Sequence, residues 1–189
     1  MTTAITTKIN GVEVSRLTDT VQAVSSNPSL AAFQFRLQNR WIDCGQNQSE
    51  VQPFFGCGQE IAHREPMTLV ADEPGILLGQ DKGANPAEYL LHALAACVTT
   101  SMIYHAAARG IVIDAVESSI EGDADVRGFL DLDPNVRKGF QKIRMNIRIK
   151  SNVPDDQLRE LGLLGPMYSP VFDTITNGVS VAVQSERMA

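Results

Sequence analysis

The chain has 189 residues, and 43% of them are hydrophobic, which is enough for a core that needs no disulfide staples. Its formal net charge of −6 argues against a nucleic-acid-binding protein and against binding to an anionic membrane surface. Three cysteines without C-x-x-C spacing and three scattered histidines argue against a disulfide framework and against a metal site. We therefore expect no metal and no cofactor.

The first thirty residues carry weak structural signals. The opening MTTAITTKING lacks the apolar segment of a signal peptide, so we expect a cytoplasmic protein. A short strand is expected over residues 8–13 around an Asn10-Gly11 turn, and residues 25–29 are expected to form a loop. We treat residues 1–30 as an N-terminal extension and residues 31–189 as one domain.

Residues 32–41 alternate between apolar and polar side chains, with Phe33, Phe35 and Leu37 on one face. This period of two predicts a half-buried strand that runs towards Trp41. Residues 44–49 are polar and are expected to form a loop. A buried turn is expected at residues 54–58, and a short strand at residues 67–70.

A long helix is predicted over residues 85–110. Asn85 is a favourable N-cap, Pro86 suits the first helical position, and Glu88 completes a capping box. Gly110 supplies the C-terminal stop. Apolar residues lie nearly all round this helix, so it should be covered by a sheet and by a partner subunit. Its interruption by histidine, threonine and serine favours a helix inside a protein over a membrane span.

The second half of the chain predicts further strands and helices. Strands are expected over residues 111–121 and 139–150, the latter with alternating isoleucines facing inward. A helix should start at residues 154–156 and end before Gly165-Pro166, and Ser169 should cap a short helix through Ile175. A last strand is expected with Val179, Val181 and Val183 facing inward. The order of elements predicts one α+β domain.

Cys97 lies in the middle of the long helix and is either a buried structural cysteine or a reactive one. A nucleophilic thiol needs a lowered pKa, and the helix supplies only hydroxyl groups close to this residue. Any activating cation must come from another segment, and the candidates are Arg36, Arg40 and Arg64.

The stretch GANPAEYLLHALAAC, residues 83–97, resembles the signature of the OsmC/Ohr family of osmotically inducible and organic-hydroperoxide-resistance proteins. The resemblance to the family extends to three further short motifs, Arg109-Gly110, Gly139-Phe140 and Ser169-Pro170-Val171. It covers about residues 33–183. It implies an α+β fold with antiparallel sheets packed around a long central helix, in an intertwined homodimer.

The resemblance also implies chemistry. Peroxidase members of the family use two cysteines and an arginine–glutamate pair. The peroxidatic cysteine falls on Cys97, but Ser169 stands at the position of the resolving cysteine, and Ala87 stands where the family has its glutamate. The branch of the family that lacks the resolving cysteine therefore looks closer. Arg40 is our candidate for pairing with the Cys97 thiolate, and Glu60 is our candidate for the partner of an activating arginine.

Two functions remain open. One is reduction of organic hydroperoxides in the oxidative stress response, through Cys97 alone and with an external thiol as reductant. The other is a non-catalytic module that binds a small hydrophobic ligand at the dimer interface. The residues expected to line the binding site are Leu94, Tyr104, Ser169 and Phe172. Cys44 or Cys57 as a resolving cysteine is a weaker alternative.

Overall fold

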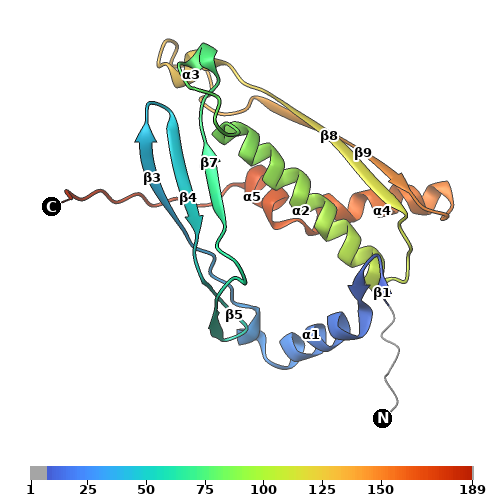
Figure 1. Cartoon of the computed structure of the whole chain (residues 1–189). Helices are drawn as coiled ribbons and strands as arrows, with labels where there is room; N and C mark the ends of the chain where they lie inside the picture. The colour runs from blue at the N-terminus through green and yellow to red at the C-terminus, as the bar shows by residue number, and fades with distance from the viewer. Residues whose placement is uncertain (1–7, 189) are drawn as a thin grey trace. The chain divides into compact units, whose positions relative to one another are not determined.

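The computed structural model describes residues 8–188. The chain divides into two compact units, residues 1–92 and residues 93–189. Helix α2, Pro86–Ala108, belongs to both, because the boundary falls within it. Figure 1 shows short antiparallel sheets combined with helices in each unit, so the α+β class is confirmed.

The first unit begins with a small hairpin and a helix. Strands β1 (Lys8–Ile9) and β2 (Val12–Glu13) flank the predicted Asn10-Gly11 turn. The helix α1 (Val14–Ser26) and the 3₁₀ turn η1 (Pro28–Ala31) follow. The sequence analysis missed α1 because its apolar residues form only a narrow stripe, and none of its residues is buried.

A three-stranded antiparallel sheet follows, in the order β3-β4-β7. Its strands are β3 (Leu37–Asp43), β4 (Gln46–Val51) and β7 (Thr68–Ala71). The prediction of a polar loop over residues 44–49 was wrong, because only Cys44 and Gly45 turn the chain. The polar residues of β4 form the central strand, where backbone hydrogen bonds to both neighbours outweigh weak side-chain preference.

The predicted turn at residues 54–58 is a hairpin of β5 (Phe54–Gly56) and β6 (Gln59–Ile61). Cys57 and Gly58 form its tip with positive φ angles of 51° and 78°, as a tight hairpin turn requires. Gly56 is buried, but Cys57 is exposed, so the expected burial of this turn was only partly correct. The strand predicted over residues 32–41 starts later, at Leu37.

The segment between β7 and α2 is held by one buried carboxylate. Asp72 is 1% exposed and accepts hydrogen bonds from the backbone amides of Glu73, Gln80 and Lys82 at 2.8, 3.1 and 3.2 Å. This loop contains the 3₁₀ turn η2 (Gly75–Leu77). Burial acts to raise the pKa of Asp72, but the three amides outweigh it and hold the pKa below its ordinary value.

The start and end of α2 agree with the prediction. The amides of Ala87 and Glu88 donate to Asn85 Oδ1 at 2.8 and 3.0 Å, and Glu88 Oε2 accepts from the Asn85 amide at 2.8 Å. This is the predicted capping box. At the other end, Gly110 has a φ of 73° and stops the helix.

Helix α2 is also long and apolar enough to cross a membrane, with a mean hydropathy of 1.3. Length and composition alone indicate little, because the core helix of a soluble protein has both. Only 28% of its most apolar window is buried within this chain. The helix therefore also carries half-buried and exposed residues.

The second unit has a compact hydrophobic core. Strands β8 (Ala115–Asp123) and β9 (Lys142–Lys150) form an antiparallel hairpin, and the short helix α3 (Val126–Phe129) lies in their connection. The predicted inward isoleucines of β9 are partly buried, and two of them pack against the core. The buried members of this core are Met102, Ala106, Ile113, Leu161 and Leu164.

Helix α4 (Asp155–Tyr168) continues through Gly165 and Pro166, so its predicted end before these residues was wrong. A Cβ atom on Gly165 would lie 2.7 Å from Val98 Cγ1 and 2.8 Å from the Val98 carbonyl oxygen. Glycine at this position therefore allows close contact between two helices, and this packing outweighs the helix-breaking tendency of the Gly-Pro pair.

The chain ends differently from the prediction. Helix α5 (Pro170–Asn177) is capped by Ser169, as predicted. After Gly178 no strand forms within the described residues, and Val179, Val181 and Val183 are 64%, 80% and 87% exposed. The prediction of an inward-facing last strand was therefore wrong for the single chain.

Candidate active site

Cys97 is a free, half-buried thiol in the middle of α2. It lies between two buried residues, Leu94 and Val98, that are 6% and 2% exposed. Tyr104, two helical turns further on, is 51% exposed. Residues seven apart lie on one face of a helix, so Cys97 and Tyr104 share a face that is half-buried at Cys97 and exposed at Tyr104.

The junction between α4 and α5 contacts α2 directly after Cys97. Gly165 packs on Val98, as described above. Ser101 Oγ donates to the Tyr168 carbonyl oxygen at 3.2 Å, and the His105 ring stacks on the Tyr168 ring with centroids 3.7 Å apart. Burial, and then the charge of Arg109, lower the pKa of His105 from its ordinary value. These contacts anchor the junction on α2 within two turns of Cys97.

Ser169 follows Tyr168 in this junction and is 2% exposed. Its hydroxyl accepts a hydrogen bond from the Phe172 amide at 3.1 Å and so caps α5. Phe172 itself is 36% exposed. Among the predicted binding residues, Leu94 and Ser169 are thus packed inside the second unit, whereas Tyr104 and Phe172 keep open surface.

The two predicted charged residues, Arg40 and Glu60, have different partners. Arg40 NH1 lies 3.2 Å from Glu50 Oε1, on the neighbouring strand β4. Glu60 instead holds Arg36 through two hydrogen bonds, of 2.7 Å to NH1 and 2.9 Å to NH2. In the structure, Glu60 forms a bidentate pair with Arg36, one of the three candidate cations, and Arg40 pairs with Glu50.

Gln34 completes this pair and was missed by the sequence analysis. Its Oε1 accepts from Arg36 Nε at 3.2 Å and from Arg36 NH2 at 2.7 Å, and the Pro53 carbonyl lies 3.4 Å from NH1. The hydrogen bond from Arg36 is the main cause that lowers the pKa of Glu60, and Glu60 likewise raises the pKa of Arg36. The guanidinium is thereby fixed in orientation. A sequence pattern cannot show this arrangement, because it brings together Glu60 of β6 and the segments before β3 and β5.

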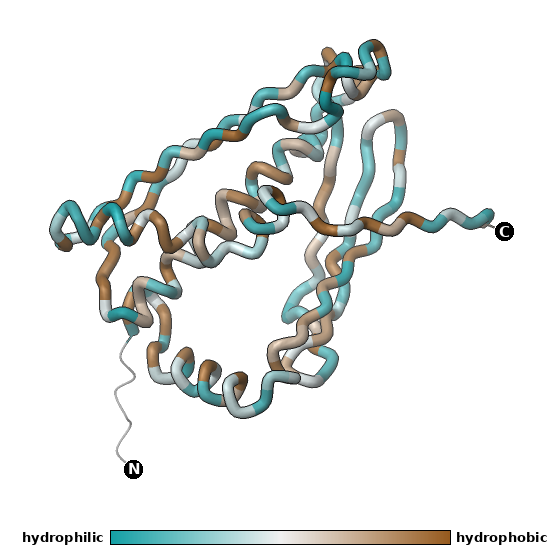
Figure 2. The backbone as a smooth tube through the Cα atoms, turned by 180° about the vertical axis from the view of Figure 1, so that it is seen from behind, coloured by the Kyte–Doolittle hydropathy of each residue, from teal (hydrophilic) through white to brown (hydrophobic). Residues whose placement is uncertain are grey.

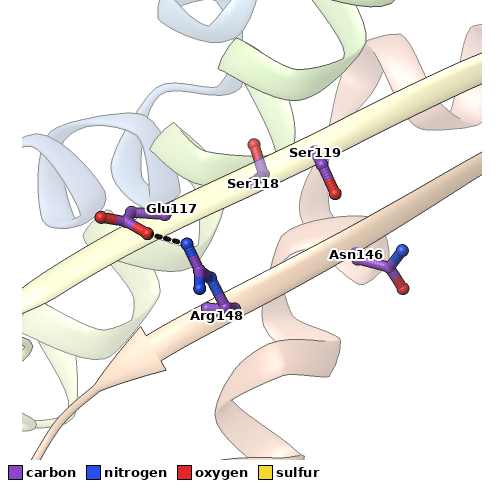
Figure 3. Close-up of a pocket in the computed structure, with 5 residues that line it drawn as sticks. All are labelled: Glu117, Ser118, Ser119, Asn146 and Arg148. Carbon is purple, nitrogen blue, oxygen red and sulfur yellow. Dashed lines mark hydrogen bonds and ion pairs between the residues drawn. The ribbon is translucent and has the colours of Figure 1, made fainter.

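No cluster of three or more histidine, cysteine, aspartate or glutamate side chains that could hold a metal ion occurs among the described residues. A hollow of about 380 Å³ lies on the β8–β9 hairpin. Figure 3 shows the ion pair between Glu117 and Arg148 across it, with Ser118, Ser119 and Asn146 beside them. Its polar lining differs from that of a site for a hydrophobic ligand.

The remaining cysteines lie in hairpin turns of the first unit. Cys44 and Cys57 are both free and exposed, with positive φ angles of 46° and 51°. Cys44 Sγ donates to the Leu78 carbonyl oxygen at 3.1 Å. Within the described residues, no cysteine forms a disulfide.

A comparison with protein-family models decides the identity of the fold. The family model described as OsmC-like protein matches residues 79–184, which is more than half of the chain. The chain belongs to the OsmC-like protein family. The matched range contains Cys97, Ser169 and both helices of the junction, so the candidate site lies inside the family domain.

Solved structures agree with this OsmC-like fold. An OsmC-like protein from Mycoplasma pneumoniae has a TM-score of 0.57 at 18% identity, over 75% of this chain and 86% of that one. An organic hydroperoxide resistance protein OsmC from Legionella pneumophila has a TM-score of 0.56 at 16% identity, over 78% and 93% of the two chains. An OsmC-like protein of unknown function from Vibrio cholerae scores 0.56 at 11% identity, over 76% and 94%. No curated protein matches the chain significantly.

Proposed function

We propose that this OsmC-like protein reduces organic hydroperoxides with Cys97 as its only reacting cysteine. The observation that carries the proposal is the placement of Cys97, a free, half-buried thiol in the middle of α2 and inside the family domain. Ser169 cannot form a disulfide, and its hydroxyl is already used as a helix cap. We therefore propose a reductant from outside the chain, with Cys44 or Cys57 as the weaker alternative.

In the proposed reaction, the Cys97 thiolate attacks the terminal oxygen of the hydroperoxide and forms a sulfur–oxygen bond. The oxygen–oxygen bond breaks, and the alcohol leaves after it takes up a proton. An external thiol then condenses with the sulfenic acid and releases water, and a second thiol frees Cys97 as a disulfide of the reductant forms. Abundant small thiols are typical of a cytoplasmic setting, which we also propose.

Arg36 is our proposed activating cation, in place of Arg40. Its guanidinium is oriented by Glu60 and Gln34, whereas Arg40 is held by one ion pair to Glu50. A cation near a thiol favours the thiolate and stabilises negative charge on the departing oxygen. We propose that Glu60 orients this arginine in place of the glutamate missing at Ala87.

We further propose that the protein acts as a homodimer. The large apolar side chains of Leu90 and Tyr104 on α2 are 41% and 51% exposed. A second copy that packs on these side chains would remove their apolar surface from water, which is favourable. The mass of the native protein in solution, measured by light scattering after size exclusion, tests this point.

The decisive experiment follows Cys97 by intact mass and peptide mapping after cumene hydroperoxide is added. A Cys44→Ser/Cys57→Ser variant isolates the reaction, and Cys97→Ser in that background is the matched control. We expect rapid oxidation of Cys97 and thiol-dependent turnover that the control lacks. Oxidation no faster than that of a free thiol would remove the proposal, and Arg36→Lys should slow it markedly because a lysine cannot be held bidentately.

A second variant tests the external reductant. Ser169→Cys restores a thiol at the end of α4, in the junction that Ser101 and Gly165 anchor on α2. We expect hydroperoxide to convert this variant to an internal disulfide with Cys97, and turnover then to accept a dithiol reductant. The binding alternative predicts instead a thermal shift by apolar ligands that survives Cys97→Ser.

A further inference from the structure

His105 is a half-buried titratable group on α2 that the proposed reaction does not use. Most of α2 has the colours of apolar residues in Figure 2, and five of its residues are buried. An imidazole that is taken out of water beside such a helix needs a specific partner, because polar groups lose hydration there. For His105 this partner is the ring of Tyr168, the last residue of α4.

The two rings are in direct contact. Their planes are inclined by 14° and their centroids lie 3.7 Å apart, which leaves no room for a water molecule between them. Ser101 Oγ donates to the Tyr168 carbonyl oxygen at 3.2 Å. The amide of Phe172 donates to Ser169 Oγ at 3.1 Å, directly after Tyr168. Movement of the Tyr168 ring away from His105 therefore also disturbs the hydrogen bonds at the junction of α4 and α5, which Figure 1 shows beside α2.

This junction borders the turn of α2 that carries Cys97. On a helix with 3.6 residues per turn, Ser101 and His105 lie about 40° and 80° round the axis from Cys97. Gly165 packs on Val98, the residue next to Cys97 in the chain. A looser junction therefore uncovers the side of α2 beside the thiol, which is itself half-buried.

The groups around His105 disfavour its protonated form. Burial and then the charge of Arg109, one turn later on α2, lower the pKa of His105. Within the described residues, no carboxylate forms an ion pair with this ring to oppose them. On α5, Asp173 accepts a hydrogen bond from Asn177 at 2.6 Å. On α4, the ring of Tyr168 contacts the imidazole, whereas the charged residues lie at least about 12 Å along the helix from Tyr168. These charged residues are Asp155, Asp156, Arg159 and Glu160.

The direction of the pKa gives the sign of the effect. A tyrosine ring attracts a cation, so the contact with Tyr168 alone would favour protonated His105. Burial and Arg109 outweigh this attraction, because the pKa of His105 in the folded chain is lowered. The folded junction therefore loses stability as the pH falls below the ordinary histidine value of about 6.5, since an imidazole in water takes up a proton first.

We propose that His105 is a positioning residue for the reaction at Cys97: its neutral ring holds the α4–α5 junction on α2, and its protonation releases the junction. The inference rests on the proposed function, because it describes access to the same thiol. In the neutral state the junction covers the side of α2 next to Cys97. In acid the charged imidazole moves into water, and reagents reach Cys97 more readily.

Hydrogen exchange of the full chain, followed by mass spectrometry, tests the release of the junction. The readout is the protection factor of the Phe172 and Asp173 amides, which donate to Ser169. The use of protection factors removes the pH dependence of exchange itself. We expect the factor to fall by up to about twofold from pH 8 to about pH 6.5, and further below it, because half of the released His105 is protonated at its ordinary pKa.

Three variants supply the controls. His105→Phe keeps a ring that stacks on Tyr168 but takes up no proton, so its protection factors should not change with pH. Tyr168→Leu removes the other ring and should give low factors at every pH, and it takes the place of His105→Phe if that variant does not fold. His92→Gln removes an exposed histidine of the same helix and should keep the wild-type pH profile. An NMR titration of the His105 ring should give a pKa below about 6.5.

Alkylation of Cys97 by iodoacetamide tests the effect on the thiol. The rate is measured in the Cys44→Ser/Cys57→Ser background, with and without His105→Phe. Both chains carry the same Cys97, so the quotient of the two rates largely cancels the change of its thiolate fraction with pH. We expect this quotient to rise as the pH falls from 8 to 5, together with the loss of protection at the junction.

The outcomes separate this inference from the proposed function. Three results would overturn it: the same loss of protection in His105→Phe as in wild type, a His105 pKa above its ordinary value, or a quotient that stays constant while protection falls. None of these measurements uses a hydroperoxide. Failure of Cys97 to react with cumene hydroperoxide would therefore remove the proposed function, and the pH-dependent hold of His105 on the junction would still stand.

Discussion

The two compact units of the chain differ in where their apolar side chains lie. The second unit collects them in a core around Met102, Leu161 and Leu164, which are 0% to 3% exposed. In the described part of the first unit, Ala71 is the only buried hydrophobic residue. Its aromatic rings instead stack on the surface, with centroids of Phe33, Phe35 and Phe54 5.5 to 6.3 Å apart.

This difference indicates what stabilises each unit. The second unit is held by burial of apolar area, which is non-directional and large. The first unit is held by strand ladders, by the amides around Asp72 and by the Arg36 hydrogen bonds. Its large apolar side chains stay exposed in the described chain. Substitutions that separate core packing from hydrogen bonding should therefore have different effects in the two units.

The largest effect is expected in the core of the second unit. Leu161→Ala leaves a cavity at a side chain that is 1% exposed, and should lower the free energy of unfolding by about 2–5 kcal/mol. Leu163→Ala, on the same helix but 60% exposed, should change it by no more than about 0.5 kcal/mol. Urea unfolding followed by circular dichroism measures both. Equal effects would show that the core is placed wrongly.

The contact between α4 and α2 gives the next effect. Gly165→Ala forces a methyl group against the Val98 backbone and should cost about 1–3 kcal/mol of stability. Gly162→Ala on the same helix meets only Ile149 Cδ1 at 3.8 Å and should stabilise by roughly 0.5–1 kcal/mol, because alanine favours the helix. Opposite signs in urea unfolding are expected, and a neutral Gly165→Ala would contradict the close helix contact.

The hydrogen-bonded loop of the first unit should respond to pH. The pKa of Asp72 is lowered in the folded chain, so its contribution is fully present above the ordinary value of about 4 and is lost as the pH falls through the folded value. Asp72→Asn should lower the urea midpoint at pH 7, and the deficit should shrink below pH 4. A deficit that is constant with pH would show that charge plays no part.

The smallest effect is expected at the cap of α5. Ser169→Ala removes the acceptor for the Phe172 amide and should cost about 1 kcal/mol. Thr176→Ala on the same helix removes only a hydroxyl bonded to the carbonyl four residues before it, and should stay within about 0.5 kcal/mol. If Ser169→Ala were neutral in urea unfolding, the cap would not explain why a buried serine stands at this position.

Local chemistry allowed much of the fold to be predicted. Sequence reveals helix ends, because each one depends only on residues a few positions apart. This holds for the capping box of Asn85 and Glu88, for the stop at Gly110 and for the cap at Ser169. The alternating isoleucines of β9 were also predicted correctly, because one buried face imposes a period of two.

Tertiary contacts decided what the sequence left open. Polar β4 is a strand because two neighbours satisfy its backbone, and α4 continues past Gly165 because Val98 packs there. Glu60 of β6 meets Arg36, which lies just before β3, and Arg40 of β3 meets Glu50 of β4, because such pairs depend on which segments lie side by side in the fold. The sequence by itself determined the α+β class, the long capped helix and the position of Cys97. Only the folded chain determined which charges meet, because hydrogen bonds between distant segments require the geometry that packing creates.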